Sequence, residues 1–122
     1  MTEEKKVLNL VMRKKHALEI LRGEKVREFR AGTEHWARIL GEFGDPDDKY
    51  LVTGLKRFDI VHFYPYNNKW FLDVEFKDMG AYEVNDEFIS HYKDEVAAQK
   101  GEWWFVIRLG KVIDTNLTLE EG

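Results

Sequence analysis

The sequence predicts one α+β domain built on a small, strongly curved sheet or barrel. The chain has 122 residues, close to the commonest size of a single domain. Hydrophobic residues make up 43% of it, enough for an ordinary folded core. The predicted elements run strand, helix, strand, helix and then mainly strands with one inserted helix. No repeat or linker interrupts them, so residues 1–122 are predicted to be a single domain.

The first predicted elements are a strand, a helix and an extended segment. Residues 7–12 form a short apolar run, which predicts a buried strand. Residues 14–22 carry apolar side chains three and four positions apart, which predicts a helix with one buried stripe. Gly23 follows as a suitable left-handed C-cap. Residues 25–30 are predicted to be extended.

The middle of the chain predicts a helix, a loop and two strands. Thr33 is a suitable N-cap for a helix over residues 34–40. Residues 41–49 contain Gly, Pro and Asp in the pattern of a turn-rich loop. Residues 58–64 and 70–77 alternate between apolar and polar side chains, which predicts two half-buried strands joined by a hairpin-like connection.

The last third predicts a helix between strands. Met79-Gly80 is predicted to close the strand before it. Asn85 is a plausible N-cap for a helix over residues 86–99. Residues 103–109 are apolar on both faces except at one position, which predicts a covered central strand. Residues 110–113 are predicted to be a turn followed by a short strand.

Composition excludes several classes of protein. Without cysteine the chain cannot form a disulfide, a thiolate zinc site or a cysteine nucleophile. It lacks a phosphate loop, a dinucleotide-binding motif, a zinc-protease motif and an EF-hand loop, and its four histidines lack ligand spacing. We therefore expect neither a metal nor another cofactor. No apolar run approaches 18 residues, and residues 1–6 lack a signal-peptide apolar region, so we expect a cytoplasmic protein with no membrane partner.

Charge is divided unevenly along the chain. The formal net charge is −4, but residues 1–40 carry +4 and residues 41–122 carry −8. The overall acidity disfavours a protein that coats nucleic acid through many phosphate contacts. A basic first third on an acidic body would direct an anion to one face. The alternative is a solvated surface whose charge is simply uneven.

One charged segment follows the first predicted helix. It reads Gly23-Glu24-Lys25-Val26-Arg27-Glu28-Phe29-Arg30, and Met12-Arg13-Lys14-Lys15 precedes that helix. This arrangement resembles the ASCH family, a branch of the PUA-like β-barrels, whose pattern is G-x-K-x-x-E-x-R after a strand–helix unit. Gly23, Lys25, Glu28 and Arg30 fill all four places. Later strands are also similar, whereas residues 83–102 are less familiar and are predicted to be a helical insert.

The resemblance implies a PUA-like β-pseudobarrel, with a helix after the first strand and further peripheral helices, that binds RNA or a nucleotide-like small anion. In the implied cleft, Lys25 and Arg30 contact the anion, Glu28 orients Arg30 or reads a base edge, and Glu75 lies across the site. The alternative from the same residues is a structural ion-pair network. A third alternative is a protein-interaction module whose charged cleft is only structural.

The resemblance also implies a possible activity. One class of relatives removes the acetyl group from N4-acetylcytidine with a Lys, a Thr three residues later and a distant Glu. Lys25 and Glu75 match two of these roles, and Glu28 occupies the Thr place. A carboxylate cannot replace the hydroxyl as an acyl acceptor, because the mixed anhydride is far more reactive than an ester. Binding is therefore the main hypothesis, and a small hydrolase that uses Lys25 with Glu75 or Glu28 as acid–base groups is the alternative.

Two further features of the cleft follow from geometry. In a regular strand Glu28 and Arg30 share one face and Lys25 points the other way. If all three line one cleft, Lys25 must sit in the turn before the strand or beside a bulge, and we predict this irregularity. Trp36 and Tyr66 lie in or near irregular segments at the expected rim, so they are the predicted stacking residues for a base.

Overall fold

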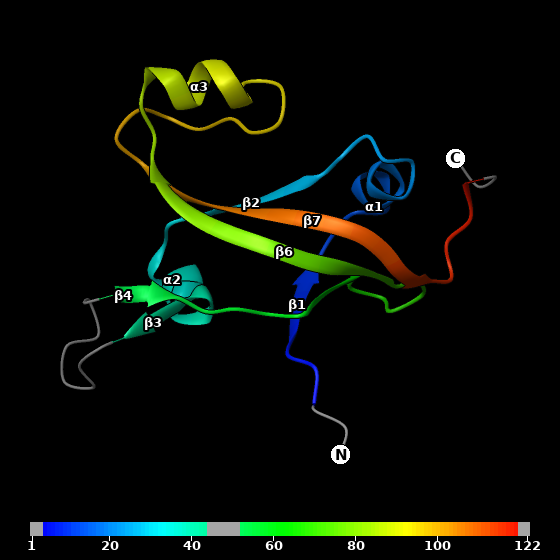
Figure 1. Cartoon of the computed structure of the whole chain (residues 1–122). Helices are drawn as coiled ribbons and strands as arrows, with labels where there is room; N and C mark the ends of the chain where they lie inside the picture. Colours follow the sequence, from blue (N-terminus) through cyan, green and yellow to red (C-terminus); the bar gives the residue numbers. More distant parts are fainter. Residues whose placement is uncertain (1–3, 44–51, 120–122) are drawn as a thin grey trace. The chain divides into compact units, whose positions relative to one another are not determined.

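The computed structural model describes residues 4–43 and 52–119, which contain seven strands and three helices (Figure 1). In chain order the elements are β1 (Val7–Val11), α1 (Lys14–Leu21), β2 (Arg27–Ala31), α2 (Glu34–Leu40), β3 (Gly41–Phe43), β4 (Val52–Leu55), β5 (Ile60–Tyr64), β6 (Leu72–Glu83), α3 (Asp86–Tyr92) and β7 (Trp103–Thr115). Five strands form a mixed sheet in the order β1-β5-β6-β7-β2, and β3 pairs with β4. The fold is therefore α+β, as predicted.

The chain divides into two compact units. The first contains Met1–Glu28, Arg57–Asp78 and Arg108–Gly122, and the second contains Phe29–Lys56 and Met79–Ile107. The long strands β6 and β7 each contribute residues to both units. No helix in the described part of the chain has both the length and the apolar character needed to cross a membrane.

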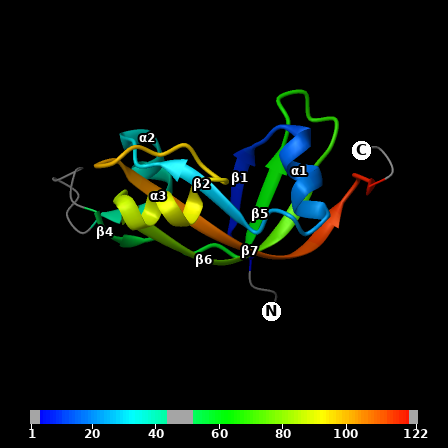
Figure 2. The same ribbon diagram turned by 90° about the horizontal axis from the view of Figure 1, so that it is seen from above.

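The first unit is built on a parallel strand pair. β1 runs parallel to β5, from Val7 opposite Ile60 to Val11 opposite Tyr64, and Figure 2 shows the two strands side by side with α1 next to them. β6 pairs antiparallel with the other edge of β5. The period-2 alternation buries one face completely. Its buried side chains are Leu8, Leu10, Val61, Phe63, Leu72 and Val74, each 3% exposed or less.

The opposite side chains of the same strands, together with Phe71 immediately before β6, form what we call the outer face, defined by Asn9, His62, Tyr64, Phe71 and Asp73. Asn9, His62 and Asp73 lie side by side across β1, β5 and β6, because Asn9 pairs with His62 and His62 pairs with Asp73. His62, Tyr64, Phe71 and Asp73 are partly exposed, and Asn9 is exposed.

The second unit has its own hydrophobic cluster. Phe29, Val84, Phe88 and Val106 are buried in it, and five partly buried side chains pack against it: Ile89, Tyr92, Val96, Ala98 and Trp104. Helix α2 begins as predicted, because the Thr33 hydroxyl accepts a hydrogen bond from the backbone N–H of Trp36 at 3.3 Å.

Helix α3 is shorter than predicted. The sequence predicts a helix over residues 86–99, but α3 ends at Tyr92. Its start agrees with the prediction, since Asn85 Oδ1 accepts from the backbone N–H of Phe88 at 2.8 Å. After a turn at residues 93–95, Val96 and Ala98 pack against the cluster of the second unit. Burial of these two side chains thus takes precedence over continuation of the helix.

Two glycines predicted to end strands lie inside strands instead. β6 continues through Gly80 to Glu83, and β7 continues through Gly110 to Thr115. A Cβ at Gly80 would lie 2.6 Å from ring atoms of Tyr82, and a Cβ at Gly110 would lie 2.9 Å from Cβ and Cδ of Glu75. Each glycine therefore leaves room for a neighbouring side chain rather than making a turn.

The loop predicted over residues 41–49 is only partly described. Gly41–Phe43 forms β3 rather than loop, and it pairs with β4, which the sequence does not predict. Residues 44–49 lie outside the described residues, as do the first three residues of the N-terminal segment.

Candidate functional site

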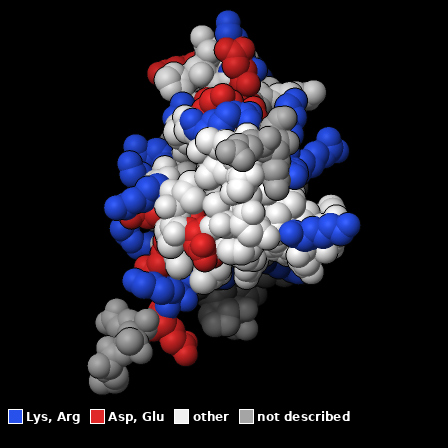
Figure 3. Space-filling model, turned by 90° about the vertical axis from the view of Figure 1, so that its right-hand side faces the viewer, with Lys and Arg blue, Asp and Glu red and all other residues white. Residues whose placement is uncertain are grey.

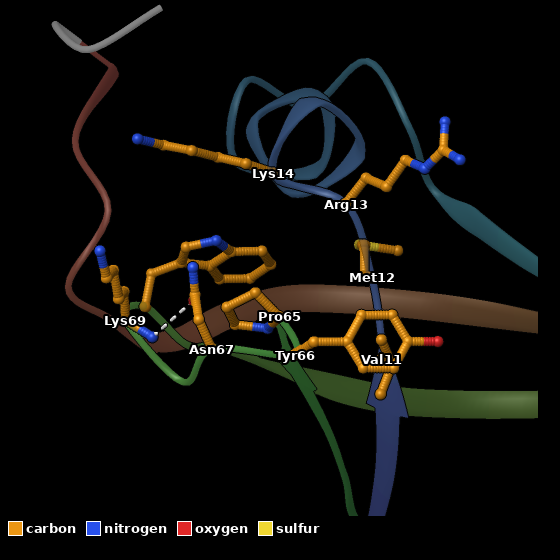
Figure 4. A pocket seen from close by; sticks show the side chains of 9 residues that line it. Val11, Met12, Arg13, Lys14, Pro65, Tyr66, Asn67 and Lys69 are labelled. Carbon is orange, nitrogen blue, oxygen red and sulfur yellow. Dashed lines mark hydrogen bonds between the residues drawn. The ribbon is translucent and has the colours of Figure 1, made fainter.

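A pocket of about 800 Å³ in the first unit is the candidate site (Figure 4). Two segments line it, the end of β1 with the start of α1 and the turn that joins β5 to β6. Its lining residues are Val11, Met12, Arg13, Lys14, Pro65, Tyr66, Asn67, Lys69 and Trp70. Figure 4 shows Arg13 and Lys14 on one side of it and the turn residues on the other.

Backbone hydrogen bonds fix the segment that carries the first two cations. The N–H of Met12 donates to the carbonyl of Tyr64 at 2.9 Å, which holds the end of β1 against β5. Arg13 is the extended N-cap residue of α1, with φ −78° and ψ 144°, and its carbonyl accepts from the N–H of His16 at 3.0 Å. The chain turns into the helix here, so Arg13 and Lys14 both leave the backbone beside the pocket.

The turn on the opposite side is also held in place. Asn68 adopts a positive φ of 55°, which Asn tolerates better than most residues, and its N–H donates to the carbonyl of Pro65 at 3.2 Å. The N–H of Lys69 donates to Oδ1 of Asn67 at 3.1 Å. From the C-terminal segment, Nδ2 of Asn116 donates to the carbonyl of Lys69 at 3.3 Å. The backbone of Lys69 is thus anchored at both its N–H and its carbonyl.

The large apolar side chains that line the pocket differ in exposure. Met12 and Trp70 are 7% and 9% exposed, so they belong to the packed wall of the pocket. Tyr66, by contrast, is 92% exposed. A large ring held on an ordered turn with almost all of its surface in water is available to contact a ligand.

The charges at the pocket are all of one sign. Arg13, Lys14 and Lys69 are exposed, and no Asp or Glu is among the described residues that line the pocket. Figure 3, which looks onto the end of the first unit that carries α1 and the β5–β6 turn, shows Lys and Arg on both sides of a mostly uncharged surface, with smaller groups of Asp and Glu among them. The pocket therefore suits an anion, although the chain as a whole is acidic.

Of the residues predicted to bind a ligand, Tyr66 lines this pocket. Lys25 lies outside it, among the described residues between α1 and β2, as the predicted irregularity requires. Its N–H donates to the carbonyl of Glu19 at 3.2 Å. The pKa of the Glu19 carboxyl lies below its ordinary value, mainly because of a hydrogen bond from His16 and partly because of the charge of Lys25. Lys25 thus contributes to the potential around the end of α1.

Glu28 and Glu75 are placed differently from each other. Glu28 is only 6% exposed, and it is the one buried polar or charged side chain among the described residues. Glu75 lies over Gly110 on β7. The N–H of Leu109, next to Gly110, donates to the carbonyl of Val26 at 2.9 Å. Glu75 therefore lies beside the part of β7 that is hydrogen-bonded to Val26, the residue after Lys25.

Arg30 and Trp36 meet within the second unit. The guanidinium carbon of Arg30 lies 5.1 Å from the centre of the Trp36 ring, a cation–π contact. The Arg30 guanidinium also donates to the carbonyl of Phe29 at 3.1 Å. Two residues predicted to contact the ligand separately are therefore in contact with each other.

The sequence prediction missed a second polar group in the first unit. On the outer face, Nδ1 of His62 and Oδ1 of Asp73 are 2.5 Å apart. The His62 ring is near-parallel to two neighbouring rings, with Tyr64 at 5.6 Å and 23° and Phe71 at 6.1 Å and 22°. The signal was present in the sequence. His62 and Asp73 both occupy outward positions of two alternating strands joined by a short turn, and hairpin pairing brings such positions together.

Comparisons with protein-family profiles, curated proteins and solved structures found no match to this chain.

Proposed function

We propose that the chain binds a short RNA element or a nucleotide-like anion, with a phosphate held in the pocket. The observation that carries this proposal is that three cationic side chains, Arg13, Lys14 and Lys69, line one pocket with the exposed ring of Tyr66. A guanidinium can grip a phosphate through two hydrogen bonds, and an ammonium acts as a point charge. An exposed aromatic ring offers a face on which a base can stack.

The size and charge of the pocket favour a small ligand. Its volume of about 800 Å³ lies within the usual range for sites that bind small molecules. Three cations can neutralise only a few phosphates, and the net charge of −4 disfavours long tracking along a nucleic acid. A mononucleotide or a few nucleotides of single-stranded RNA match these properties better than a duplex does.

The resemblance to the ASCH family supports the same class of ligand through another set of residues. We retain Lys25, Glu28 and Glu75, which all belong to the first unit, as a proposed motif site within a PUA-like fold. The two candidate sites predict different effects of mutation on ligand binding. If the pocket holds the phosphate, Arg13→Ala weakens binding and Lys25→Ala does not, and the reverse holds for the motif site.

Binding of a nucleotide panel would test the proposal. The probes are nucleoside monophosphates and fluorescein-labelled tetranucleotide RNAs, measured by thermal shift and by fluorescence anisotropy at 50 mM salt. We expect Arg13→Ala and Lys69→Ala each to weaken binding about five- to fifty-fold, as expected for loss of a charge-assisted contact. Lys111→Ala is the matched control, because it removes an exposed cation of the same unit that does not line the pocket.

Other outcomes distinguish the alternatives. If no member of the panel binds, the proposal is wrong and a protein-interaction module gains support. If a modified nucleoside such as N4-acetylcytidine is turned over, and Glu75→Gln abolishes the turnover, the chain is the small hydrolase. If Lys111→Ala weakens binding as much as Arg13→Ala, the effect is general electrostatics and the pocket is not the site.

A further inference from the structure

We propose that the outer face receives the bases of a single-stranded nucleic acid whose phosphate is held in the pocket. The inference rests on the proposed function and extends it from one phosphate to a path for several nucleotides. It is carried by three ring systems, Phe71, His62 and Tyr64, that lie next to one another on this face.

The rings form a continuous aromatic strip. His62 is near-parallel to both of its neighbours, with Tyr64 on the same strand and Phe71 across the β5–β6 pair. All three side chains are partly exposed. His62 and Tyr64 lie on β5, and Phe71 immediately precedes β6 with its N–H bonded to Asn116 and its carbonyl bonded to Thr115, so a base that packs on these rings does not have to order a loop. Aromatic side chains on an open sheet are a sequence-tolerant platform for unpaired bases.

Asp73 adds a polar group to the strip and orients the ring of His62. Its carboxylate accepts a hydrogen bond from Nδ1 of His62, which holds the imidazole in an orientation near-parallel to the rings of Tyr64 and Phe71. The other ring nitrogen, Nε2, then remains to meet a base edge. Asn9, opposite His62 on β1, is exposed and adds an amide donor and acceptor beside it.

The strip leads directly to the pocket. Tyr64 pairs with Val11, and Val11 is one of the residues that line the pocket. Tyr64 is also followed at once by Pro65 and Tyr66, which line the pocket as well. A strand whose phosphate lies among the pocket cations can therefore extend its bases over Tyr64 and then His62 without leaving the first unit.

The charges indicate which part of the ligand lies where. The outer face carries the carboxylate of Asp73, and Glu75 follows it on β6, so phosphates are disfavoured there. The pocket carries cations and no acidic side chain among its described lining residues. This division places the phosphate in the pocket and the bases on the strip.

Ligand length separates the two sites experimentally. The probes are uridine monophosphate, the tetranucleotide rU4 and the matching deoxy tetranucleotide dT4. We expect Phe71→Ala and His62→Ala to weaken binding of rU4 roughly 5- to 100-fold, the usual range for loss of one base-stacking contact, and to leave binding of the mononucleotide unchanged. Arg13→Ala should weaken binding of all three probes. Tyr82→Ala, which removes an exposed ring from the second unit, is the matched control.

A second measurement guards against misfolded variants. In the unaltered protein, the ring signals of His62 in NMR spectra should shift on addition of rU4 and stay in place on addition of uridine monophosphate. Phe71→Leu keeps an apolar side chain and should retain the fold while it weakens binding of rU4.

Failure of this inference can be distinguished from failure of the proposed function. If Arg13→Ala weakens binding but Phe71→Ala, His62→Ala and the His62 signals show no effect with rU4, the inference is overturned and the proposed function stands. If none of the three probes binds, the proposed function fails and the inference fails with it. Equal affinities for rU4 and dT4 would support a strip that reads bases alone, whereas tighter binding of rU4 would support added contacts to the 2′-hydroxyl.

Discussion

Nδ1 of His62 lies 2.5 Å from Oδ1 of Asp73, and the two residues are direct partners across β5 and β6. A carboxylate can only accept a hydrogen bond, so Nδ1 must carry the hydrogen. In the neutral ring Nε2 is then the acceptor, and this tautomer is fixed by the pairing of the two strands.

This arrangement predicts an unusual tautomer for His62. In nitrogen–proton correlation spectra recorded above pH 8, Nδ1 of His62 should carry the hydrogen, and the exposed His35 should report an ordinary mixture. Asp73→Asn should shift the His62 ring toward that mixture, because an amide can donate as well as accept. Identical spectra for the two histidines in the unaltered protein would contradict the hydrogen bond.

Asp78 and Arg108 form a paired contact on β6 and β7. Nε of Arg108 donates to Oδ1 of Asp78 at 2.7 Å, and the second guanidinium nitrogen donates to Oδ2. This hydrogen bonding, with a smaller effect of the positive charge, lowers the pKa of Asp78 below its ordinary value of 3.8. The stabilisation is therefore present above pH 3.8 and is lost as the pH falls through the folded-state pKa.

Removal of Arg108 should reverse this shift. In Arg108→Gln, the Asp78 carboxyl should titrate at a higher pH, closer to its ordinary value, as followed by ¹³C NMR. Glu19 is the internal control, since its lowered pKa depends chiefly on His16 and should not move. Both side chains of the pair are about half exposed, so the effect on stability should be small. An unchanged Asp78 titration would contradict the pairing.

Alanine substitutions at Gly32 and Gly80 should show whether crowding against backbone destabilises the fold more than crowding against a side chain. A Cβ at Gly32 would lie 2.7 Å from the carbonyl oxygen of Trp103, which accepts a hydrogen bond from Gly32 itself. A Cβ at Gly80 would meet the ring of Tyr82, which can rotate away. We expect Gly32→Ala to lower the free energy of unfolding by about 1–3 kcal/mol in urea titrations, and Gly80→Ala by less.

Gly54 provides the control for these variants. Among the described residues, a Cβ there meets Oε2 of Glu42 at 3.4 Å, an ordinary contact, so Gly54→Ala should be close to neutral. Equal destabilisation by the Gly32 and Gly80 variants would mean that backbone crowding is not the cause.

Helix caps and hydrophobic alternation correctly predicted the elements that depend on residues close together in the sequence. The cap at Thr33 predicted the start of α2, and the alternation around Phe63 and Leu72 predicted the two-faced strands β5 and β6. These signals failed where the local structure depends on a residue far away in the sequence. Gly110 was predicted to lie in a turn, but it lies inside β7 and leaves room for the side chain of Glu75. The C-terminal half of the predicted third helix was lost because Val96 packs in the cluster of the second unit.

The pocket could not be predicted for the same reason. Arg13 and Lys69 are far apart in the sequence, and only the parallel register of β1 with β5 brings their segments together. A single sequence carries no signal for that register, because parallel strands are joined through long connections rather than tight turns. Tyr66 was predicted to stack a base because it lies in an irregular segment; it lines the pocket, and its stacking stays a prediction.

Tyr66 and Trp70 line the same pocket but should respond to mutation in opposite ways. Tyr66 is 92% exposed, so Tyr66→Ala removes little packing and should change the free energy of unfolding by less than about 0.5 kcal/mol. Trp70 is 9% exposed, so Trp70→Ala should cost about 3–5 kcal/mol through lost contacts and a cavity. If the pocket binds a nucleotide, Tyr66→Ala should nevertheless weaken that binding about tenfold through loss of stacking. Urea titration and fluorescence anisotropy on the same samples measure both effects. A Tyr66→Ala protein that binds uridine monophosphate as tightly as the unaltered protein would exclude the ring from the site, because its stability would show that the fold is intact.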